Sequence, residues 1–312
     1  MSSLVDDTIF VLSSYVFSHK TYCHNLTKLN LSSFNTENVN NLGFIFYNCT
    51  NLNTINLSSF NTLQVFNMAF LLYNCSKLST IDLSSFQTPK VINMANMFYN
   101  CSNLISLDLS TFNTESITSF ANMFYNCTNL KSVVLTSFNT EKVSNMGNMF
   151  YNCTSLVNVN LSSFNTENCS NFTNMFYNCS SLKTLNLSSF KIDNANNISG
   201  MFYNCCSLED LDISSFRTPN VYSMSNMFYN CAKLKKVDLS KFDTKIVNSF
   251  SGLFYGCKSL EEIDLSSLAT GNVNNIKDMF EGCEKLEKIR VGKDLFGKIK
   301  KVDPGLLEKV TL

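Results

Sequence analysis

The chain has 312 residues, and its 24 basic and 24 acidic residues give a formal net charge of zero. A nucleic-acid-binding protein is expected to carry a basic patch or stripe, so this balance argues against that class. Hydrophobic residues make up 45% of the chain, yet no apolar run reaches the roughly 18 residues of a membrane-spanning helix. The composition favours a globular protein with a polar, nearly neutral surface, which suits protein or carbohydrate partners.

The amino-terminal segment, residues 1–22, does not fit the pattern of the rest of the chain. Two acids, Asp6 and Asp7, precede an apolar stretch at residues 8–12, whereas a secretory signal peptide carries positive charge there. We therefore identify no signal peptide. Three interpretations stay open: the protein remains inside the cell, Met1 is an internal start in a longer surface protein, or export uses another signal. We expect the segment to be an amino-terminal cap or a truncated repeat.

The sequence then repeats every 26 residues. Eleven cysteines mark this spacing: Cys23, Cys49, Cys75, Cys101, Cys127, Cys153, Cys179, Cys205, Cys231, Cys257 and Cys283. A period of roughly 20 to 50 residues, held over most of a chain, is typical of a stacked repeat array in which each coil contacts its neighbours. We therefore predict a solenoid domain over residues 23–291.

Each coil is predicted to hold one strand and one short helix. Apolar and polar residues alternate at residues 107–110, which is the period of a half-buried strand. Apolar residues recur at steps of three and four across residues 143–153, the spacing of a short helix that Thr140 or Asn145 could cap. The predicted fold class is an α/β repeat: a curved, right-handed leucine-rich-repeat solenoid with one parallel sheet backed by short helices.

The carboxy-terminal residues leave this register. After residue 291 the sequence becomes rich in lysine and contains an Asp-Pro-Gly turn at residues 303–305. The last repeat of an array must present a polar outer face, so we expect residues 292–312 to form a carboxy-terminal cap. The basic run of Lys298, Lys300 and Lys301 is expected to be a solvated face rather than a binding patch.

The repeat resembles that of a known family. Met97, Phe98, Cys101 and Leu104, followed by Leu-Asp-Leu-Ser at residues 107–110, match the leucine-rich-repeat surface proteins of the BspA type. The resemblance covers the whole predicted solenoid. It implies a non-enzymatic protein on the surface of a bacterium or microbial eukaryote, with a role in adhesion to host or matrix proteins or to other cells. The alternative is an intracellular leucine-rich-repeat scaffold, favoured by the missing signal peptide and the free thiols.

The regularly spaced cysteines are expected to form a ladder of buried, reduced thiols, each S–H donating weakly to a carbonyl. Neighbouring cysteines would lie parallel, about one strand spacing apart, whereas a disulfide needs converging Cβ atoms. Of the cysteines, the off-register Cys169 and Cys206 are the candidates for exposed, reactive thiols, although we favour a structural role for both. Because the chain has no Cys-x2-Cys pair and only two histidines, His19 and His24, we expect no metal site and no other cofactor.

A tyrosine stands two residues before most ladder cysteines, from Tyr47 to Tyr255. Aromatic rings at fixed intervals in a solenoid usually pack on one another, with their hydroxyls reaching water. We favour this structural interpretation over the alternative, in which the rings stack on sugars or bases.

The candidate partner-binding surface is the solvent face of the sheet, because extended faces of solenoids commonly bind partners. Its candidate residues are Asp82, Asp108, Asn160, Asn186, Asp212, Asp238 and Asp264 in one row, and Lys236 and Glu262 in the row beside it. Single carboxylates from successive coils lack the about six to eight oxygens that Ca²⁺ needs. We expect a protein partner, such as a host or matrix protein, or a glycan; a solvated face without a ligand is the alternative.

Catalytic motifs are missing from the sequence. It has two histidines, ten glycines, no Gly-x-Ser-x-Gly motif and no phosphate-binding glycine loop. No nucleophile, general base or nucleotide site can be assembled from these residues. We therefore expect that the protein is not an enzyme.

Overall fold

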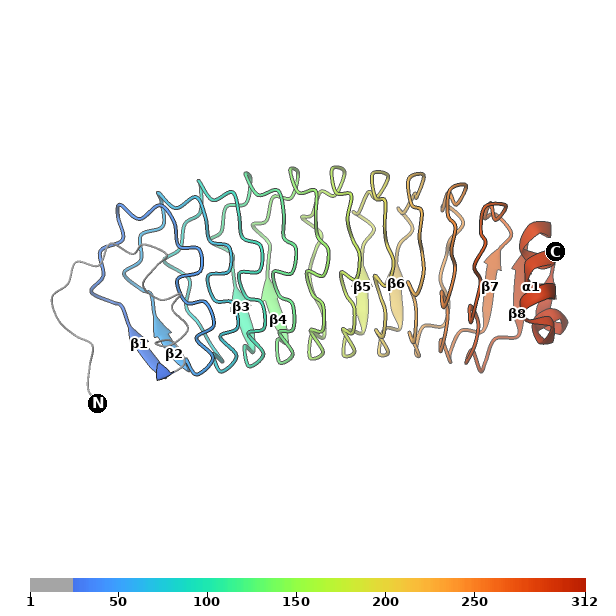
Figure 1. Ribbon diagram of the computed structural model, residues 1–312, viewed down its shortest axis with the longest axis horizontal. Helices are drawn as coiled ribbons and strands as arrows, with labels where there is room; N and C mark the ends of the chain where they lie inside the picture. The colour runs from blue at the N-terminus through green and yellow to red at the C-terminus, as the bar shows by residue number, and fades with distance from the viewer. Residues whose placement is uncertain (1–24) are drawn as a thin grey trace.

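The computed structural model describes residues 25–312, so the segment expected to cap the amino-terminal end, and Cys23 with it, lie outside the described residues. Figure 1 shows coils stacked side by side into an elongated, gently curved array that ends in a helix. The described strands that pair do so in parallel. The predicted solenoid of parallel strands is therefore confirmed.

Paired strands lie one coil apart in four of the five pairs, with residues 26 positions apart side by side, such as Leu107 beside Val133. They are β1 (Lys28–Asn30), β2 (Thr54–Asn56), β3 (Ser106–Asp108), β4 (Ser132–Val134), β5 (Thr184–Asn186), β6 (Asp210–Asp212), β7 (Glu262–Leu265), β8 (Lys288–Val291) and β9 (Val310–Thr311). They form four separate sheets rather than one: β1–β2, β3–β4, β5–β6 and β7–β8–β9. The sheets are separated by coils whose equivalent residues, such as 158–160, are not in a strand.

The return segments are not the short helices that the sequence predicted. Across residues 120–127, backbone amides alternate between two roles. The amides of Phe120 and Asn122 donate to carbonyls of the next coil, whereas the amide of Met123 donates back to the carbonyl of Phe120. Asn122 and Asn126 have φ angles of 56° and 59°. Each segment is therefore a run of tight turns, and positive φ at its asparagines breaks any helix.

The two proposed caps have different roles. Asn145 Oδ1 accepts a hydrogen bond from the amide of Gly147 at 2.9 Å, so it does cap the first turn of its return segment. Thr140 Oγ1 instead donates to the carbonyl of Asn165 in the next coil at 2.7 Å. Threonine is buried at this position in most described coils. It therefore ties neighbouring coils together.

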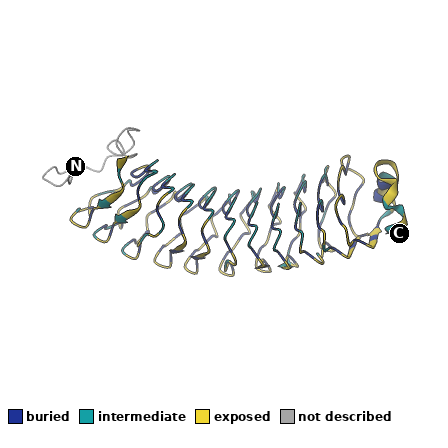
Figure 2. Ribbon diagram, turned by 90° about the horizontal axis from the view of Figure 1, so that it is seen from below, coloured by how far each residue is buried: buried dark blue, intermediate teal, exposed yellow. Residues whose placement is uncertain are grey.

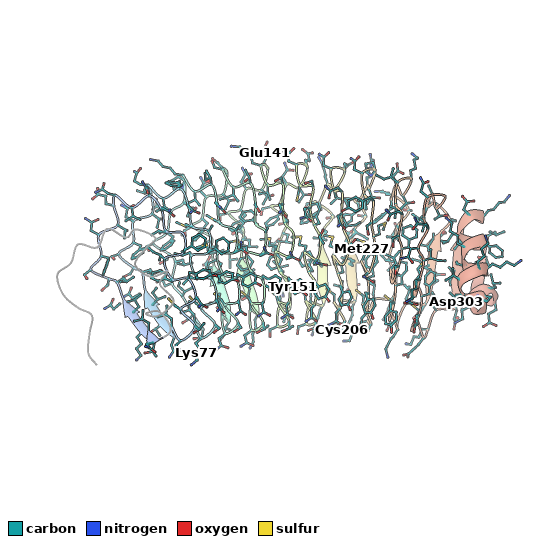
Figure 3. All side chains as sticks on the ribbon, viewed as in Figure 1. Lys77, Glu141, Tyr151, Cys206, Met227 and Asp303 are labelled. Atoms are coloured by element: carbon teal, nitrogen blue, oxygen red, sulfur yellow. The ribbon has the colours of Figure 1, made fainter. Side chains whose placement is uncertain are left out.

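A single apolar core runs through the described coils. Leu135, Val143, Met149 and Phe150, all at most 1% exposed, occupy the inward positions that the repeat predicted. Figure 2 shows buried and exposed segments alternating in coil after coil, and Figure 3 places Met227 inside the array. Each such aliphatic or aromatic side chain stabilises the fold by roughly 1.5 to 3 kcal/mol. The burial pattern thus follows the predicted register although the return segments are not helical.

The helix α1 (Lys293–Val302) lies at the carboxy-terminal end of the array, followed by the 3-10 helix η2 (Pro304–Lys309) and β9 (Figure 1). Its Leu295 and Ile299 are buried. Lys298 is not the solvated cation that we expected, because its Nζ donates to the carbonyl of Thr270 at 2.7 Å and to two more carbonyls nearby. Where α1 packs against these carbonyls, the lysine supplies the hydrogen-bond donor that they need.

Candidate functional site

The residues of the predicted binding face are all exposed. They are Asp82, Asp108, Asn160, Asn186, Asp212, Asp238, Asp264, Lys236 and Glu262. Between the two rows lies the middle residue of each strand, such as Leu107 in β3, which points into the core. Alternation along the strand therefore places both rows on one side of the array, uncovered by any other described segment.

The row that contains Asp108 also has a structural role that the sequence reasoning missed. Asp108 Oδ1 accepts a hydrogen bond from the amide of Ser110 at 2.9 Å, and Asn160 Oδ1 accepts one from Ser162 at 3.0 Å. The available signal was Asp or Asn followed two residues later by Ser, a spacing typical of a side-chain turn. Serine amides and hydroxyls lower the pKa of the carboxyls of Asp82, Asp108, Asp212, Asp238 and Asp264.

The carboxy-terminal part of the face is hollowed. The hollow has a volume of about 520 Å³, and its charged lining residues are Lys236, Asp238, Glu262, Asp264, Lys288 and Arg290. Apolar Val237, Leu239 and Ile263 also contribute to it. The structure thus brings together four of the nine predicted face residues. The other five lie outside the hollow.

Two charged residues of the hollow, Lys288 and Arg290, were not predicted. In the register of β7 and β8, Glu262 is opposite Lys288 and Asp264 is opposite Arg290. Arg290 Nη1 lies 3.2 Å from Asp264 Oδ2, with both side chains about half exposed. An exposed pair of this kind contributes at most about 1 kcal/mol, so it fixes the position of the charges more than it stabilises the fold. The sequence did contain a signal for Lys288, because the 26-residue spacing that leads from Lys236 to Glu262 leads next to this residue.

The remaining charges of the hollow have no ion-pair partner in the described part of the chain. Glu262 stands between Lys236 and Lys288 in its row but forms no ion pair with either. Asp238 has none either, although its carboxyl accepts the Ser240 amide at 2.8 Å. These four charged groups are therefore available to a ligand.

The tyrosine column on the return side is a second candidate surface. Consecutive rings from Tyr47 to Tyr255 stack with centroids 4.3 to 4.7 Å apart. The predicted self-stacking is confirmed. Burial and the neighbouring phenols Tyr151 and Tyr99 raise the pKa of Tyr125 to about 12. Because each ring face between the column's ends covers the next ring, those faces cannot stack on a sugar or base.

The ladder cysteines donate hydrogen bonds as predicted. Cys127 Sγ lies 3.1 Å from the carbonyl oxygen of Phe98 in the preceding coil. Burial raises the pKa of Cys127 to about 12, which disfavours the reactive thiolate. The ten described cysteines from Cys101 onward are free thiols.

The two off-register cysteines differ from each other. The structure rules out an exposed thiol at Cys169: it is fully buried, and burial raises its pKa to about 12. The reason is its register, since it occupies the inward position that Val143 holds one coil earlier. Cys206 is partly exposed, with its Sγ 3.5 Å from the carbonyl oxygen of Ser180.

Residues 25–312 contain neither a cluster of metal ligands nor a membrane-spanning helix. No group of three or more histidine, cysteine, aspartate or glutamate side chains gathers there in a way that could hold a metal ion. Within the same range, no helix combines the length and the apolar character needed to cross a membrane.

Comparison with known protein families gives three overlapping matches to one family model. The model is described as "Mycoplasma protein of unknown function, DUF285", and it matches residues 13–136, 103–210 and 207–294. The chain belongs to the DUF285 family. The matches include nearly all of the 26-residue coils, so membership in DUF285 rests on the repeat itself. No match was found among curated proteins.

Solved structures similar to this DUF285 chain include bacterial leucine-rich repeat proteins. One from Bacteroides ovatus is 20% identical, with a TM-score of 0.43, and the match covers 93% of this chain and 84% of that chain. A leucine-rich cell surface protein from Faecalibacterium prausnitzii is 19% identical, with a TM-score of 0.38 and coverage of 79% and 75%. One from Eubacterium ventriosum is 18% identical, with a TM-score of 0.43 and coverage of 75% and 57%.

Proposed function

We propose that this DUF285 protein is a non-enzymatic repeat protein whose exposed sheet face binds another protein. The observation that carries the proposal is the uncovered face itself. In the described coils the outward side chains of the strands, such as Ser106 and Asp108 of β3, are exposed and are repeated at a fixed register. A row of this kind offers many contacts to one extended partner.

The face is also held rigid before any partner binds. The row of Asp and Asn residues accepts hydrogen bonds from the serine amides that follow, as Asp82 does from Ser84 at 2.9 Å. Thr114 adds links between coils, since its Oγ1 donates to the carbonyl of Asn139 and accepts from the amide of the same residue, both at 2.8 Å. A preorganised surface loses little conformational freedom on binding, which favours affinity.

The finer part of the proposal concerns location. The resemblance to the BspA type supports display at a cell surface and adhesion to a host or matrix protein, or to a glycan. An intracellular scaffold is the second candidate, and one observation favours it: the ten described cysteines from Cys101 onward are free thiols, and nearly all of them are buried. Abundant free thiols are typical of a reducing compartment.

Binding is tested with the purified full chain on immobilised matrix proteins and glycans. Ser106→Arg combined with Ser132→Arg places two bulky cations on β3 and β4. The matched control, Thr118→Arg with Ser144→Arg, places the same two cations on exposed return-segment positions. We expect the first variant to lose binding and the control to keep it. Equal binding by both variants would refute an extended partner that lies along the face across β3 and β4.

Location is tested by antibody labelling of intact and permeabilised source cells. Signal on intact cells would support surface adhesion. Signal only after permeabilisation would reject adhesion and support the scaffold.

A further inference from the structure

The outward strand positions become uniformly charged toward the carboxy-terminal end of the face. From β6 to β8, including the coil between β6 and β7, all eight outward positions carry a charge: Asp210, Asp212, Lys236, Asp238, Glu262, Asp264, Lys288 and Arg290. In β3 and β4, by contrast, Ser106, Ser132 and Val134 are uncharged. The face therefore has two chemically different parts, and the hollow lies in the charged one.

The charges of the hollow change along the array. Its first coil carries both signs, its second two carboxylates and its last two cations: Lys236 and Asp238, then Glu262 and Asp264, then Lys288 and Arg290. The two cations lie two residues apart on β8, so both point outward at the carboxy-terminal end of the hollow. Asp238 and Glu262 each lack an ion-pair partner within the described chain. A ligand that crosses the hollow along the array therefore meets unpaired carboxylates in the first two coils and only cations in the last.

We propose that this hollow recognises a segment of a partner protein that carries both signs of charge. A basic side chain of the segment lies against Asp238 and Glu262, and an acidic side chain lies against Lys288 and Arg290. The proposal deepens the proposed function, on which it rests, by naming the part of the face and the chemistry of the partner.

The choice of a mixed-charge partner follows from the lining of the hollow. Its three carboxylates, Asp238, Glu262 and Asp264, and its three cations give a net charge of zero. A uniformly acidic or basic partner would be repelled by half of these side chains, and a like-charge contact across an interface costs several kcal/mol. A segment with both signs can meet each group with its opposite.

Most charged groups of the hollow take part in no ion pair within the described chain, so they are free to bind a partner. Only Asp264 and Arg290 form an ion pair within the described lining, at 3.2 Å and with both side chains about half exposed. Glu262 is opposite Lys288 in the register yet makes no ion pair with it. Binding through Asp238, Glu262 and Lys288 therefore breaks no existing ion pair, and the single pair holds Arg290 in place.

The test uses the full chain with methyl-labelled side chains and three synthetic peptides of equal length. One peptide has a lysine half and a glutamate half, and the others are uniformly lysine or uniformly glutamate in a serine–glycine background. The methyl groups of Val237, Leu239 and Ile263 line the hollow and report binding there through their NMR shifts. We expect the mixed peptide to shift these signals saturably, and the uniform peptides to bind at least about tenfold more weakly.

A composition-preserving variant sharpens the test. Glu262→Lys with Lys288→Glu exchanges two charges that make no ion pair, and we expect about a tenfold loss of affinity for the mixed peptide. The control exchanges the remote exposed pair, Glu167→Lys with Lys191→Glu, and should bind like the wild type. Unchanged dispersion of the methyl spectrum verifies that both variants fold.

Three results would overturn the inference: no shift of the three methyl signals with the mixed peptide, equal binding of a uniform peptide, or unchanged affinity after the Glu262 and Lys288 exchange. None of them decides the proposed function, which is tested by the Ser106 and Ser132 variant on matrix proteins. Suppose that variant loses matrix binding and the three methyl signals do not shift with the mixed peptide. The proposed function would then be kept and the inference rejected.

Discussion

The Sγ atom of Cys127 lies 3.1 Å from the carbonyl oxygen of Phe98, a residue 29 positions earlier in the preceding coil. The same oxygen also accepts a hydrogen bond from the backbone amide of Cys101 at 3.1 Å, so the thiol donates to the second lone pair of the oxygen. Equivalent thiol bonds recur from Cys75 to Cys283 at 3.0 to 3.2 Å. Each ladder cysteine therefore links two coils, which gives a physical reason for a cysteine at this register.

Cys127→Ala should destabilise the array by about 1 to 2 kcal/mol, because it removes both the thiol hydrogen bond and part of a buried side chain. Denaturant unfolding measures the change. The matched control is Cys206→Ala, at a partly exposed cysteine, which should cost under about 0.5 kcal/mol. Equal costs for the two variants would contradict a bonding role for the ladder.

Thiol labelling should distinguish Cys206 from the other described cysteines. In a Cys23→Ser background, a maleimide at neutral pH should label one thiol quickly, because burial protects the others and raises the pKa of Cys169 and Cys127 to about 12. Mass spectrometry of the labelled protein identifies the site. After denaturation all twelve remaining cysteines should react. Rapid labelling of native Cys169 would show that its burial is wrong.

Sequence periodicity predicted the strands and the core because both depend on which side chains point inward. Leu107 and Leu135 follow the expected alternation. The same logic failed on the return segment, since apolar steps of three and four fit a helix and a run of tight turns equally well. Only the backbone separates the two, through positive φ at residues such as Asn122. An asparagine at one of these positions in most coils was the clue to that conformation.

The candidate site was predicted in part for a related reason. The repeat placed Asp238 and Glu262 on the outward face, because register alone fixes that position. It did not reveal the hollow, which depends on side-chain volumes, or the turn bonds that Asp238 makes to Ser240. Lys288 and Arg290 follow the last regular cysteine, where the repeat begins to change. Where the 26-residue repeat becomes irregular, it no longer shows which residues belong to the outward face.

Asn126→Ala should destabilise the array more than Asn126→Gly. Asn126 has a φ of 59°, and its side-chain amide bonds to Asn100 in one neighbouring coil and to Asn152 in the other. Both substitutions lose these bonds, but only alanine adds a left-handed backbone penalty of about 1 to 2 kcal/mol. Thermal or denaturant unfolding of the two variants measures that difference. An alanine variant as stable as the glycine variant would refute strain at this turn.

Leu135→Ala, in the middle of the array, should cost about 2 to 5 kcal/mol, because Leu135 is 1% exposed and its truncation leaves a cavity between coils. Denaturant unfolding with an unchanged slope is the measurement. Val134→Ala, on the neighbouring residue that is 39% exposed, is the control and should cost far less. A Leu135→Ala cost below about 1 kcal/mol would mean that the inward register is incorrect.

Alkaline titration should separate the tyrosine column from free phenols. Burial and the neighbouring phenols raise the pKa of Tyr125 to about 12, above the unfolded value of about 10. The folded state therefore holds this proton more tightly than the unfolded state. Its contribution to stability is complete below about pH 10 and is lost as the pH rises toward about 12.

The near-ultraviolet absorbance of phenolate follows this titration directly. Native protein should ionise at higher pH than denatured protein, and Tyr125→Phe should remove part of the high-pH component. Phenylalanine keeps the ring stacked between Tyr99 and Tyr151, so this variant removes the Tyr125 hydroxyl alone. Identical curves for native and denatured protein would mean that the stacked rings are fully hydrated, and that the column does not stabilise the coils through its protonated phenols.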